Sequence, residues 1–264
     1  MHAEIDAKMV AVKACPSARR RERPWQRQLR LCSGADLSHD YYQKSPFYFR
    51  GQYAGSLALY KVWRLDDRDV IESVVLEEVS FNLRALEAGL SVPAIFHKGF
   101  VEMHDSKYYV LAMFDAGSSH SVADYDELLF YALSLLHNVH RLHSRASLLH
   151  CDIKPDNVLW DAKRSDITLS DFGNAQTKQN ATSIRGTKGF TAPEVENCAN
   201  NTCSSDAYSV GATLLALYKG IQGLDWAGIC DSVRSLMRPN PSGRPSLDEA
   251  YETLKTQVSS VRSL

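Results

Sequence analysis

The stretch that decides the fold of this chain spans residues 150–157 and reads HCDIKPDN, and a triplet DFG follows from Asp171. Asp152 offers a carboxylate that can accept a proton, and Lys154 places a cation two positions later. Asn157 brings an amide oxygen that can bind a metal, and Asp171 brings a second carboxylate. Phosphoryl transfer from ATP needs this set of groups, because its catalysis consists mostly of positioning and of neutralising phosphate charge.

The two motifs together resemble the catalytic loop and the metal-binding motif of eukaryotic-type protein kinases. The resemblance covers about residues 30–260, and its most specific motifs lie from residue 150 onward. It implies an α+β, bilobal protein-kinase-like fold, in which a small antiparallel-sheet N-lobe with one helix precedes a mainly helical C-lobe. It also implies ATP and Mg²⁺ as cofactors and a protein as the substrate.

The resemblance gives each residue of these motifs a role. Asp152 is the expected catalytic base, which accepts or orients the proton of a substrate hydroxyl while its oxygen attacks the γ-phosphate. Lys154 is expected to stabilise the charge that develops on the same phosphate, and a lysine at this position marks Ser/Thr kinases. Asn157 and Asp171 are the expected metal ligands, because their hard oxygens suit Mg²⁺.

A lysine for the α- and β-phosphates is expected upstream. Residues 58–62 read ALYKV and resemble the strand that carries this lysine in the family, so we assign the role to Lys61. Its partner should be a glutamate on the following helix, and both Glu77 and Glu78 stand at a suitable distance along the chain. We expect Glu78, because the apolar residues after it match the family. Only one of the two glutamates can face the site, since a shift of one residue rotates a helical side chain by about 100°.

The glycine-rich loop is where the resemblance weakens. The family has three glycines there, which let backbone amides approach the phosphates. Residues 31–37, LCSGADL, keep only Gly34, and Asp36 would bring a negative charge near ATP. Either the loop is degenerate or the resemblance fails in this segment, and in both cases ATP affinity and turnover are the properties affected.

The end of the expected activation segment is also present. Residues 186–194 read GTKGFTAPE, in which Thr187 occupies a position that Ser/Thr kinases often fill with a hydroxyl near the substrate. The resemblance pairs Glu194 with Arg244 as a structural strut, and it makes Asp206 the helix residue that braces the catalytic loop.

Two departures from the family shape the expected regulation. Cys151 replaces the arginine that usually binds an activation-loop phosphate, which a thiol cannot do. We therefore expect activity that does not depend on activation-loop phosphorylation. After Tyr218, only about eight residues precede the helix expected near Trp226, so the C-lobe is shortened after its second buried helix.

Apolar periodicity predicts the first group of elements. Residues 46–49 and 57–60 flank glycines and predict a hairpin. Residues 71–88 predict a helix, and the apolar run 108–114 predicts a buried strand.

The remaining pattern is helical. Residues 128–142 and 210–218 are apolar almost all round, which predicts two buried helices. Ser246 and Glu249 have the spacing of a capping box and predict a last helix at about 247–259.

The chain divides into an extension and one domain. Residues 1–28 are a basic N-terminal extension, which we interpret as a solvated and partly disordered tail; a nuclear import signal or a contact for an acidic partner is the alternative. Residues 29–264 form the expected kinase domain, with the N-lobe at about 29–114 and the C-lobe at about 118–264.

Composition and charge narrow the possible binding partners and the expected cellular location. The 264 residues are 44% hydrophobic and carry a formal net charge of −1, so no global field favours nucleic acid or a membrane. No apolar run approaches the roughly 18 residues that span a bilayer. Charges at Glu4, Asp6 and Lys8 leave the start without the apolar core of a signal peptide, so we expect a cytoplasmic or nuclear location.

The six cysteines form no close C-x-x-C pair and have no histidine pair at zinc-ligand spacing. Reduced, unpaired thiols are therefore expected.

Three functions fit these observations. The first is a Ser/Thr protein kinase. The second is a pseudokinase that acts as a nucleotide-binding or scaffold module, which the single-glycine loop and Cys151 favour. The third is a small-molecule kinase of the choline or aminoglycoside type, which shares the catalytic Asp and Asn but typically lacks the segment ending in Glu194. The presence of Lys61, Asp152, Asn157 and Asp171 together favours the first.

Overall fold

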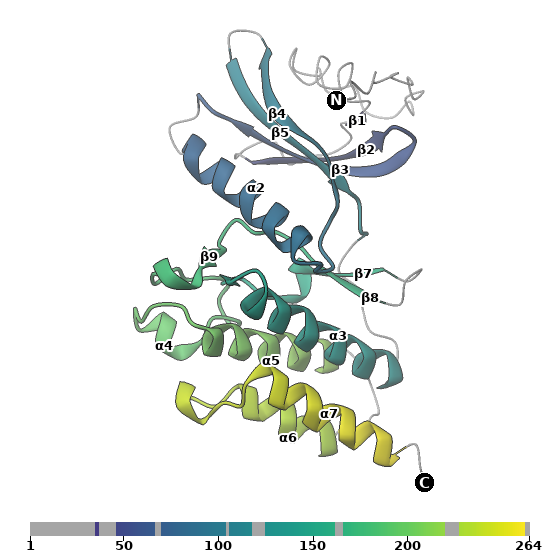
Figure 1. The fold of residues 1–264 in the computed structure, drawn as a ribbon, viewed down its shortest axis with the longest axis vertical. Coiled ribbons are helices and arrows are strands. Elements are labelled where there is room, and N and C mark those ends of the chain that lie inside the picture. The colour runs from purple at the N-terminus through teal and green to yellow at the C-terminus, as the bar shows by residue number, and fades with distance from the viewer. Residues whose placement is uncertain are drawn as a thin grey trace. The chain divides into compact units, whose positions relative to one another are not determined.

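The computed structural model describes residues 35–36, 46–66, 70–103, 106–117, 125–161, 166–219 and 227–261 (Figure 1). Gly34 and the extension at residues 1–28 lie outside the described residues. Contacts group the chain into two compact units, one of Met1–Val79 with Pro93–Asp115 and one of Ser80–Val92 with Ala116–Leu264.

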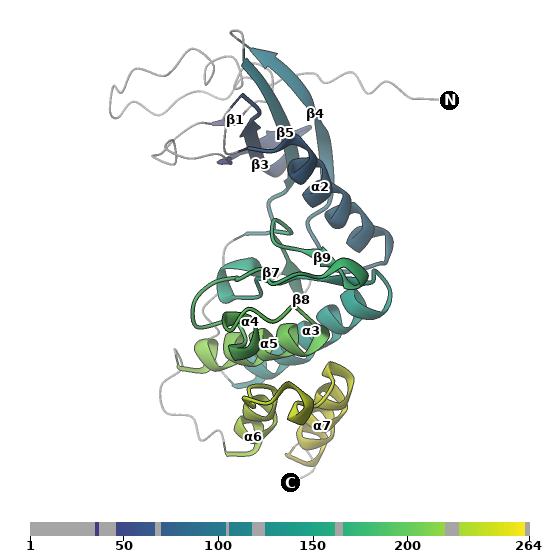
Figure 2. The same ribbon diagram turned by 90° about the vertical axis from the view of Figure 1, so that its left-hand side faces the viewer.

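The first unit is built on an antiparallel sheet with the strand order β1-β2-β3-β5-β4 (Figure 1). The strands are β1 (Ala35–Asp36), β2 (Phe47–Tyr53), β3 (Ser56–Arg64), β4 (Ile95–Met103) and β5 (Ser106–Phe114). The paired strands β4 and β5 form the long hairpin seen in Figure 2.

The predicted first hairpin is confirmed as β2 and β3. Its turn consists of Ala54 and Gly55, and both have a positive φ, of 50° and 85°. Two consecutive residues of this kind match the twist of the flanking strands, and the glycine adopts that backbone without steric cost.

The predicted strand at residues 108–114 is confirmed within β5, which is buried along nearly its whole length because β3 and β4 pair with it on either side. Apolar side chains of β2, β3 and β5 form the core of this unit. Its fully buried members include Ala58, Val62 and Ala112.

The helix predicted at residues 71–88 is α2 (Glu72–Glu87). Its first half buries Val75 and Val79. Residues 80–92, which the sequence placed with the strands, group with the second unit, because Phe81 and Ala85 belong to the helical core there.

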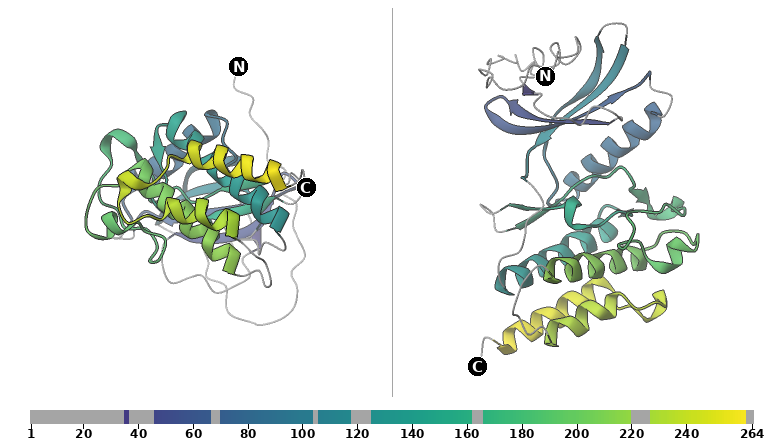
Figure 3. Two further views of the ribbon diagram at one scale, coloured as in Figure 1. Left: turned by 90° about the horizontal axis from the view of Figure 1, so that it is seen from below. Right: turned by 180° about the vertical axis from the view of Figure 1, so that it is seen from behind.

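The second unit is mainly helical (Figures 1 and 3). Its helices are α3 (Tyr125–Ser144), α4 (Pro193–Glu196), α5 (Cys203–Lys219), α6 (Ala227–Leu236) and α7 (Leu247–Val261). Two small sheets pair β6 (Leu148–Leu149) with β9 (Gln176–Thr177) and β7 (Val158–Asp161) with β8 (Asp166–Leu169). The described residues of this unit also form the short 3-10 helices η1 (Pro155–Asn157), η2 (Lys178–Asn180) and η3 (Pro241–Gly243).

Both predicted buried helices are confirmed, as α3 and α5. Leu135 and Leu142 of α3 are fully buried, because α5, α7 and β8 all pack against this helix. Gly211 of α5 lies so close to α6 that a Cβ there would come 3.0 Å from the Cβ of Leu236 and 2.8 Å from the Cγ of Met237. A glycine is therefore needed where these two helices meet.

The shortened region after the second buried helix is also present. Helix α5 ends at Lys219 and α6 begins at Ala227, one residue after the predicted start near Trp226. The α+β arrangement predicted from the sequence is thus the observed one, with an antiparallel sheet followed by a mainly helical unit.

The last helix begins with the predicted capping box. The backbone N–H of Ser246 donates to Glu249 Oε2 over 2.7 Å, and the backbone N–H of Glu249 donates to Ser246 Oγ over 3.2 Å. Each residue thus satisfies a donor that the first turn of a helix leaves without a partner.

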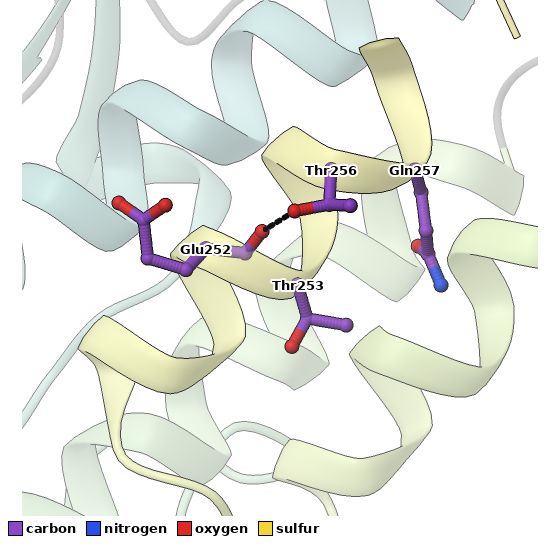
Figure 4. Close-up of a pocket in the computed structure, with 4 residues that line it drawn as sticks. All are labelled: Glu252, Thr253, Thr256 and Gln257. Carbon is purple, nitrogen blue, oxygen red and sulfur yellow. Dashed lines mark hydrogen bonds between the residues drawn. The ribbon is translucent and has the colours of Figure 1, made fainter. Parts of the chain in front are cut away.

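Loss of this cap should destabilise the protein measurably. We expect Ser246→Ala to lower the free energy of unfolding by about 1 kcal/mol. Thr256→Ala is the matched control on the same helix, and Figure 4 shows its hydroxyl donating to the Glu252 carbonyl oxygen over 2.8 Å. It should change the free energy by less than about 0.5 kcal/mol, because alanine is the better helix former. Urea unfolding of both variants checks this, and equal losses would contradict it.

Candidate active site

The backbone of the catalytic loop is held by one buried carboxylate, that of Asp206 on the first turn of α5. Its Oδ1 accepts the backbone N–H of Cys151 over 3.0 Å, and its Oδ2 accepts that of His150 over 2.8 Å. Cys151 has a φ of 64°, in the left-handed region that non-glycine residues rarely adopt. The hydrogen bond from Cys151 therefore stabilises a strained backbone, and the predicted brace by Asp206 is present.

A second contact joins this loop to the DFG motif. His150 is fully buried, its Nε2 lies 3.0 Å from the Ser170 carbonyl oxygen, and its ring lies 5.2 Å from that of Phe172. The neighbouring Asp171 is exposed and has a φ of 61°. The buried contacts of His150 and the strained backbone of Asp171 thus fix the position of the Asp171 carboxylate.

Asp152, Lys154 and Thr187 form a closed polar ring. Lys154 Nζ donates to Asp152 Oδ2 over 2.9 Å and to Thr187 Oγ1 over 2.8 Å. Asp152 Oδ1 accepts both the backbone N–H and the hydroxyl of Thr187, over 2.8 and 2.7 Å. The ring brings together a carboxylate, a cation and a hydroxyl, and it fixes both side chains that the sequence assigned to catalysis.

A glycine makes this ring possible. A Cβ on Gly186 would lie 2.5 Å from the Cys151 carbonyl oxygen and 3.0 Å from Asp152 Oδ1. Because only glycine fits, the activation segment can approach the catalytic loop closely enough for Thr187 to reach Asp152. Sequence reasoning placed Thr187 near the substrate and missed this clamp, although a glycine directly before the threonine was a usable signal.

Asn157 is buried and tied to the same carboxylate. Its Nδ2 donates to the Asp152 carbonyl oxygen over 2.9 Å and to Asp152 Oδ2 over 3.3 Å. These two bonds fix the orientation of the amide, so the other end of the group presents its oxygen. An amide oxygen and the exposed carboxylate of Asp171 are hard donors that fit Mg²⁺, which keeps several waters and binds few protein ligands. Among the described residues, no cluster of three or more His, Cys, Asp or Glu side chains could form an all-protein metal cage.

The first unit contains the predicted pair of Lys61 and Glu78. Lys61 Nζ donates to Glu78 Oε1 over 2.5 Å and is almost completely buried. It also lies 5.4 Å from the centre of the Tyr48 ring and 5.1 Å from that of Trp63. A buried ammonium needs a nearby counter-charge, and Glu78, rather than Glu77, provides this bond, as the apolar spacing predicted.

The predicted strut between Glu194 and Arg244 is present. Two parallel bonds of 2.7 and 2.8 Å join the guanidinium to the carboxylate. Arg244 is buried and also donates to the carbonyl oxygens of Ser204, Arg238 and Pro239. The end of the activation segment is thereby fastened to the start of α5 and to the turn before α7.

One member of the Asp206 network was not anticipated. His143, at the end of α3, places its Nε2 2.8 Å from Asp206 Oδ2. Burial lowers the pKa of His143, but hydrogen bonds to Asp206 and Cys203 outweigh burial and raise this pKa to about 9. In contrast, burial and the nearby Asp206 and Asp152 raise the pKa of the Cys151 thiol. Cys151 is therefore a neutral side chain.

Comparison with known proteins agrees with this geometry. Residues 90–227 match the Protein kinase domain family. The chain belongs to this family. A putative receptor protein kinase of Zea mays is 35% identical over 34% of this chain and 12% of its own length. A G-type lectin S-receptor-like serine/threonine-protein kinase of Arabidopsis thaliana is 40% identical over 36% of this chain and 12% of its own length.

A fungal protein gives a longer match. The cytokinesis protein sepH of Emericella nidulans is 33% identical over 47% of this chain, and the match covers 10% of its own length. The chain thus spans only about a tenth of the curated relatives it resembles. None of the helices in the described part of the chain is long and apolar enough to cross a membrane.

The raised pKa of His143 should be measurable. We expect its ring to titrate near pH 9 in an NMR titration, whereas the ring of His137, whose pKa is lowered by burial and by Arg141, should titrate below 6.5. The folded state then keeps a proton that the unfolded chain releases near pH 6.5. This contribution to stability is present in full below pH 6.5 and is lost as the pH rises through about 9.

The variant Cys203→Ala tests the cause. It removes a hydrogen-bond partner of His143, so the pKa of the ring should fall relative to the wild type. A wild-type pKa of 6.5 or lower would show that burial outweighs the two partners.

Proposed function

We propose that this chain is a Ser/Thr protein kinase that transfers the γ-phosphoryl group of ATP to a protein hydroxyl. The observation that carries the proposal is the ring of Asp152, Lys154 and Thr187. It places a proton acceptor and a cation within hydrogen-bond distance of one hydroxyl, with contacts of 2.7 to 2.9 Å.

The chemistry assigned to each residue follows from this arrangement. Asp152 orients the substrate hydroxyl and takes up its proton, while the hydroxyl oxygen bonds to the γ-phosphorus and the bond to the departing ADP oxygen breaks. Lys154 stabilises the negative charge that develops on the transferred phosphoryl group. Lys61, held by Glu78, is assigned to the α- and β-phosphates. Asn157 and Asp171 are assigned to Mg²⁺, which neutralises phosphate charge when bound.

Specificity for Ser and Thr rests on two supports. Lys154 and Thr187 occupy positions that resemble those of Ser/Thr kinases and contact each other directly. Among the relatives, the Arabidopsis protein is itself described as a serine/threonine-protein kinase.

We further propose that activity does not require a phosphate on the activation segment. Cys151 is buried and carries no cation that could bind one. The middle of the segment is instead anchored by uncharged contacts: Asn201 Nδ2 donates to the carbonyl oxygens of Thr182 and Ile184 over 2.9 and 3.0 Å. Gln176 Oε1 accepts the backbone N–H of Thr182 over 2.6 Å. These bonds hold the segment in place without an added charge.

One experiment separates the three candidate functions. The protein is incubated with Mg²⁺, labelled ATP and a generic basic protein, beside an Asp152→Asn control. Label transferred to protein by the wild type alone supports the proposal. Nucleotide binding without transfer favours a pseudokinase, and transfer only to small alcohols favours a small-molecule kinase.

Removal of the base should reduce turnover and leave binding intact. We expect Asp152→Asn to lower kcat by roughly 10²- to 10⁴-fold, the range attributed to a positioned general base. The affinity for ATP should change little, because Asp152 is assigned to the protein substrate. Transfer assays with parallel nucleotide-binding titrations measure both quantities, and an unchanged kcat would remove Asp152 from the mechanism.

The hydroxyls of the activation segment should behave differently from one another. We expect Thr182→Ala and Ser183→Ala each to keep kcat/KM within about twofold, a change of less than about 0.5 kcal/mol. Thr187→Ala should lower kcat, because it removes the hydroxyl from the ring, and Thr187→Ser should restore most of the loss. If Thr182→Ala or Ser183→Ala abolished activity, and phosphorylation of this segment activated the wild type, independence from phosphorylation would be wrong.

A further inference from the structure

The activation segment carries positive charge and no acidic side chain. Residues 172–193 include Lys178, Arg185 and Lys188, and neither aspartate nor glutamate occurs in this run. All three of these cations are exposed. Since the whole chain has a formal net charge of −1, the run departs from the charge balance of the molecule. A surface charge of one sign attracts a partner of the opposite sign.

Two of these cations bracket the point at which the segment contacts the candidate catalytic base. Thr187 donates its hydroxyl to Asp152 Oδ1 over 2.7 Å, and a Cβ on Gly186 would lie 3.0 Å from the same oxygen. Arg185 directly precedes this Gly-Thr pair, and Lys188 directly follows it. Because consecutive Cα atoms are about 3.8 Å apart, each cation stands one residue away from the contact with Asp152. A peptide whose hydroxyl is bound at Asp152 therefore passes close to both cations.

The backbone around Lys188 is held in place. The backbone N–H groups of Phe190 and Thr191 both donate to the Thr187 carbonyl oxygen, over 3.0 and 3.1 Å. The Phe190 carbonyl oxygen accepts the hydroxyl of Ser209 over 2.7 Å, which fastens this turn to α5. Lys188 is thus an exposed residue in an anchored turn, so little backbone freedom is lost when a ligand binds there.

The guanidinium of Arg185 is also held, but not by a carboxylate. Its Nη2 donates to the backbone carbonyl oxygen of Glu196 over 3.0 Å and lies 3.3 Å from Cys198 Sγ. Within the described part of the chain, neither Arg185 nor Lys188 forms an ion pair. Both positive charges are therefore open to carboxylates of a bound partner.

Acidic side chains near this surface limit where such carboxylates can lie. Glu194, which follows the run, is already paired with Arg244 by bonds of 2.7 and 2.8 Å. Asp156, on η1 in the catalytic loop, is exposed and has the opposite charge to the run. Because Asp156 favours a cation, we expect acidic residues to be preferred on one flank of the acceptor, the flank that lies along the activation segment.

We infer that Arg185 and Lys188 select protein substrates with acidic residues beside the Ser or Thr that is phosphorylated. The inference rests on the proposed kinase function, which puts the acceptor hydroxyl at Asp152. Each cation pairs with an aspartate or glutamate of the substrate, and an exposed pair of this kind changes affinity by up to about fivefold. The preference weakens with added salt, because the screening length falls from about 8 Å at physiological ionic strength to about 3 Å at 1 M.

Matched acceptor peptides test the preference. Each peptide carries a single serine, with glutamates before it, glutamates after it, or glutamines at the same places. We expect one of the two glutamate peptides to exceed the glutamine peptide in kcat/KM by at least about threefold at low salt. The advantage should shrink as salt is added. If neither glutamate peptide exceeded the glutamine peptide, the inference would be overturned and the proposed kinase function would stand.

Variants assign the preference to these two cations. Lys188→Gln and Arg185→Gln should each reduce the advantage of the glutamate peptide by about two- to fivefold. Lys188→Glu should reverse the preference, so that a peptide with lysines on the same flank becomes the better substrate. A gain of this kind cannot come from a loss of folding.

Lys178→Gln is the matched control. It removes the same charge from the same segment, but the ammonium of Lys178 donates to the His143 carbonyl oxygen over 3.3 Å, at the end of α3. The advantage of the glutamate peptide should stay within about twofold of the wild type, a change smaller than an exposed ion pair can give. An equal loss in Lys178→Gln and Lys188→Gln would show that only the net charge of the segment matters, and the assignment to Lys188 would be wrong.

A binding measurement separates this inference from the proposed function. The same peptides with alanine in place of serine cannot accept a phosphoryl group, and fluorescence anisotropy gives their affinity for the full chain. Tighter binding of one glutamate peptide to the wild type than to Lys188→Glu supports the inference, even if no phosphoryl group is transferred. Equal binding to both, with circular dichroism showing that both are folded, overturns it whatever the outcome of the phosphotransfer assay.

Discussion

The buried carboxylate of Asp206 is the constraint on which the rest of the candidate active site depends. It accepts hydrogen bonds from the backbone N–H groups of His150 and Cys151 and from the ring of His143, so the end of α3 and the catalytic loop are both joined to the distant helix α5 at two oxygen atoms. A carboxylate this deeply buried is stable only because these donors replace the water it has lost. Burial raises the pKa of Asp206, but the hydrogen bond and the charge of His143 outweigh this and lower it. The charged carboxylate of Asp206 thus holds the loop that carries Asp152 in place.

The second constraint is steric. Gly186 lets the activation segment come close to the catalytic loop, and Gly211 lets α5 approach α6. The absence of a Cβ atom at each position thus permits a close contact within the helical unit. Asp206 positions the loop from one side, and Thr187 closes on Asp152 from the other. The geometry of the candidate active site therefore depends on the buried charge of Asp206 and on the missing side chain at Gly186.

Much of this could be predicted from the sequence, and the reasons are local. The motif around Asp152, the capping box at Ser246 and the apolar runs of α3 and β5 each depend on neighbouring residues, so their spacing is readable. The choice of Glu78 over Glu77 came from the resemblance of the apolar residues after Glu78 to the family. The contact of His143 with Asp206 could not be predicted, because the two residues lie 63 positions apart. The grouping of residues 80–92 with the helical unit depends on tertiary contacts, which periodicity does not report.

The aromatic surroundings of Lys61 have an optical consequence. The ammonium group lies 5.1 Å from the centre of the Trp63 ring, and that ring is 5% exposed. A cation against an indole shifts the energy of its excited state, and a buried indole is shielded from quenchers in solution. Trp63 is therefore a built-in fluorophore beside the ion pair of Lys61 and Glu78. Any event that moves Lys61 away from Glu78 should change the wavelength of the Trp63 fluorescence emission. Such a change can be followed without a label or a mutation.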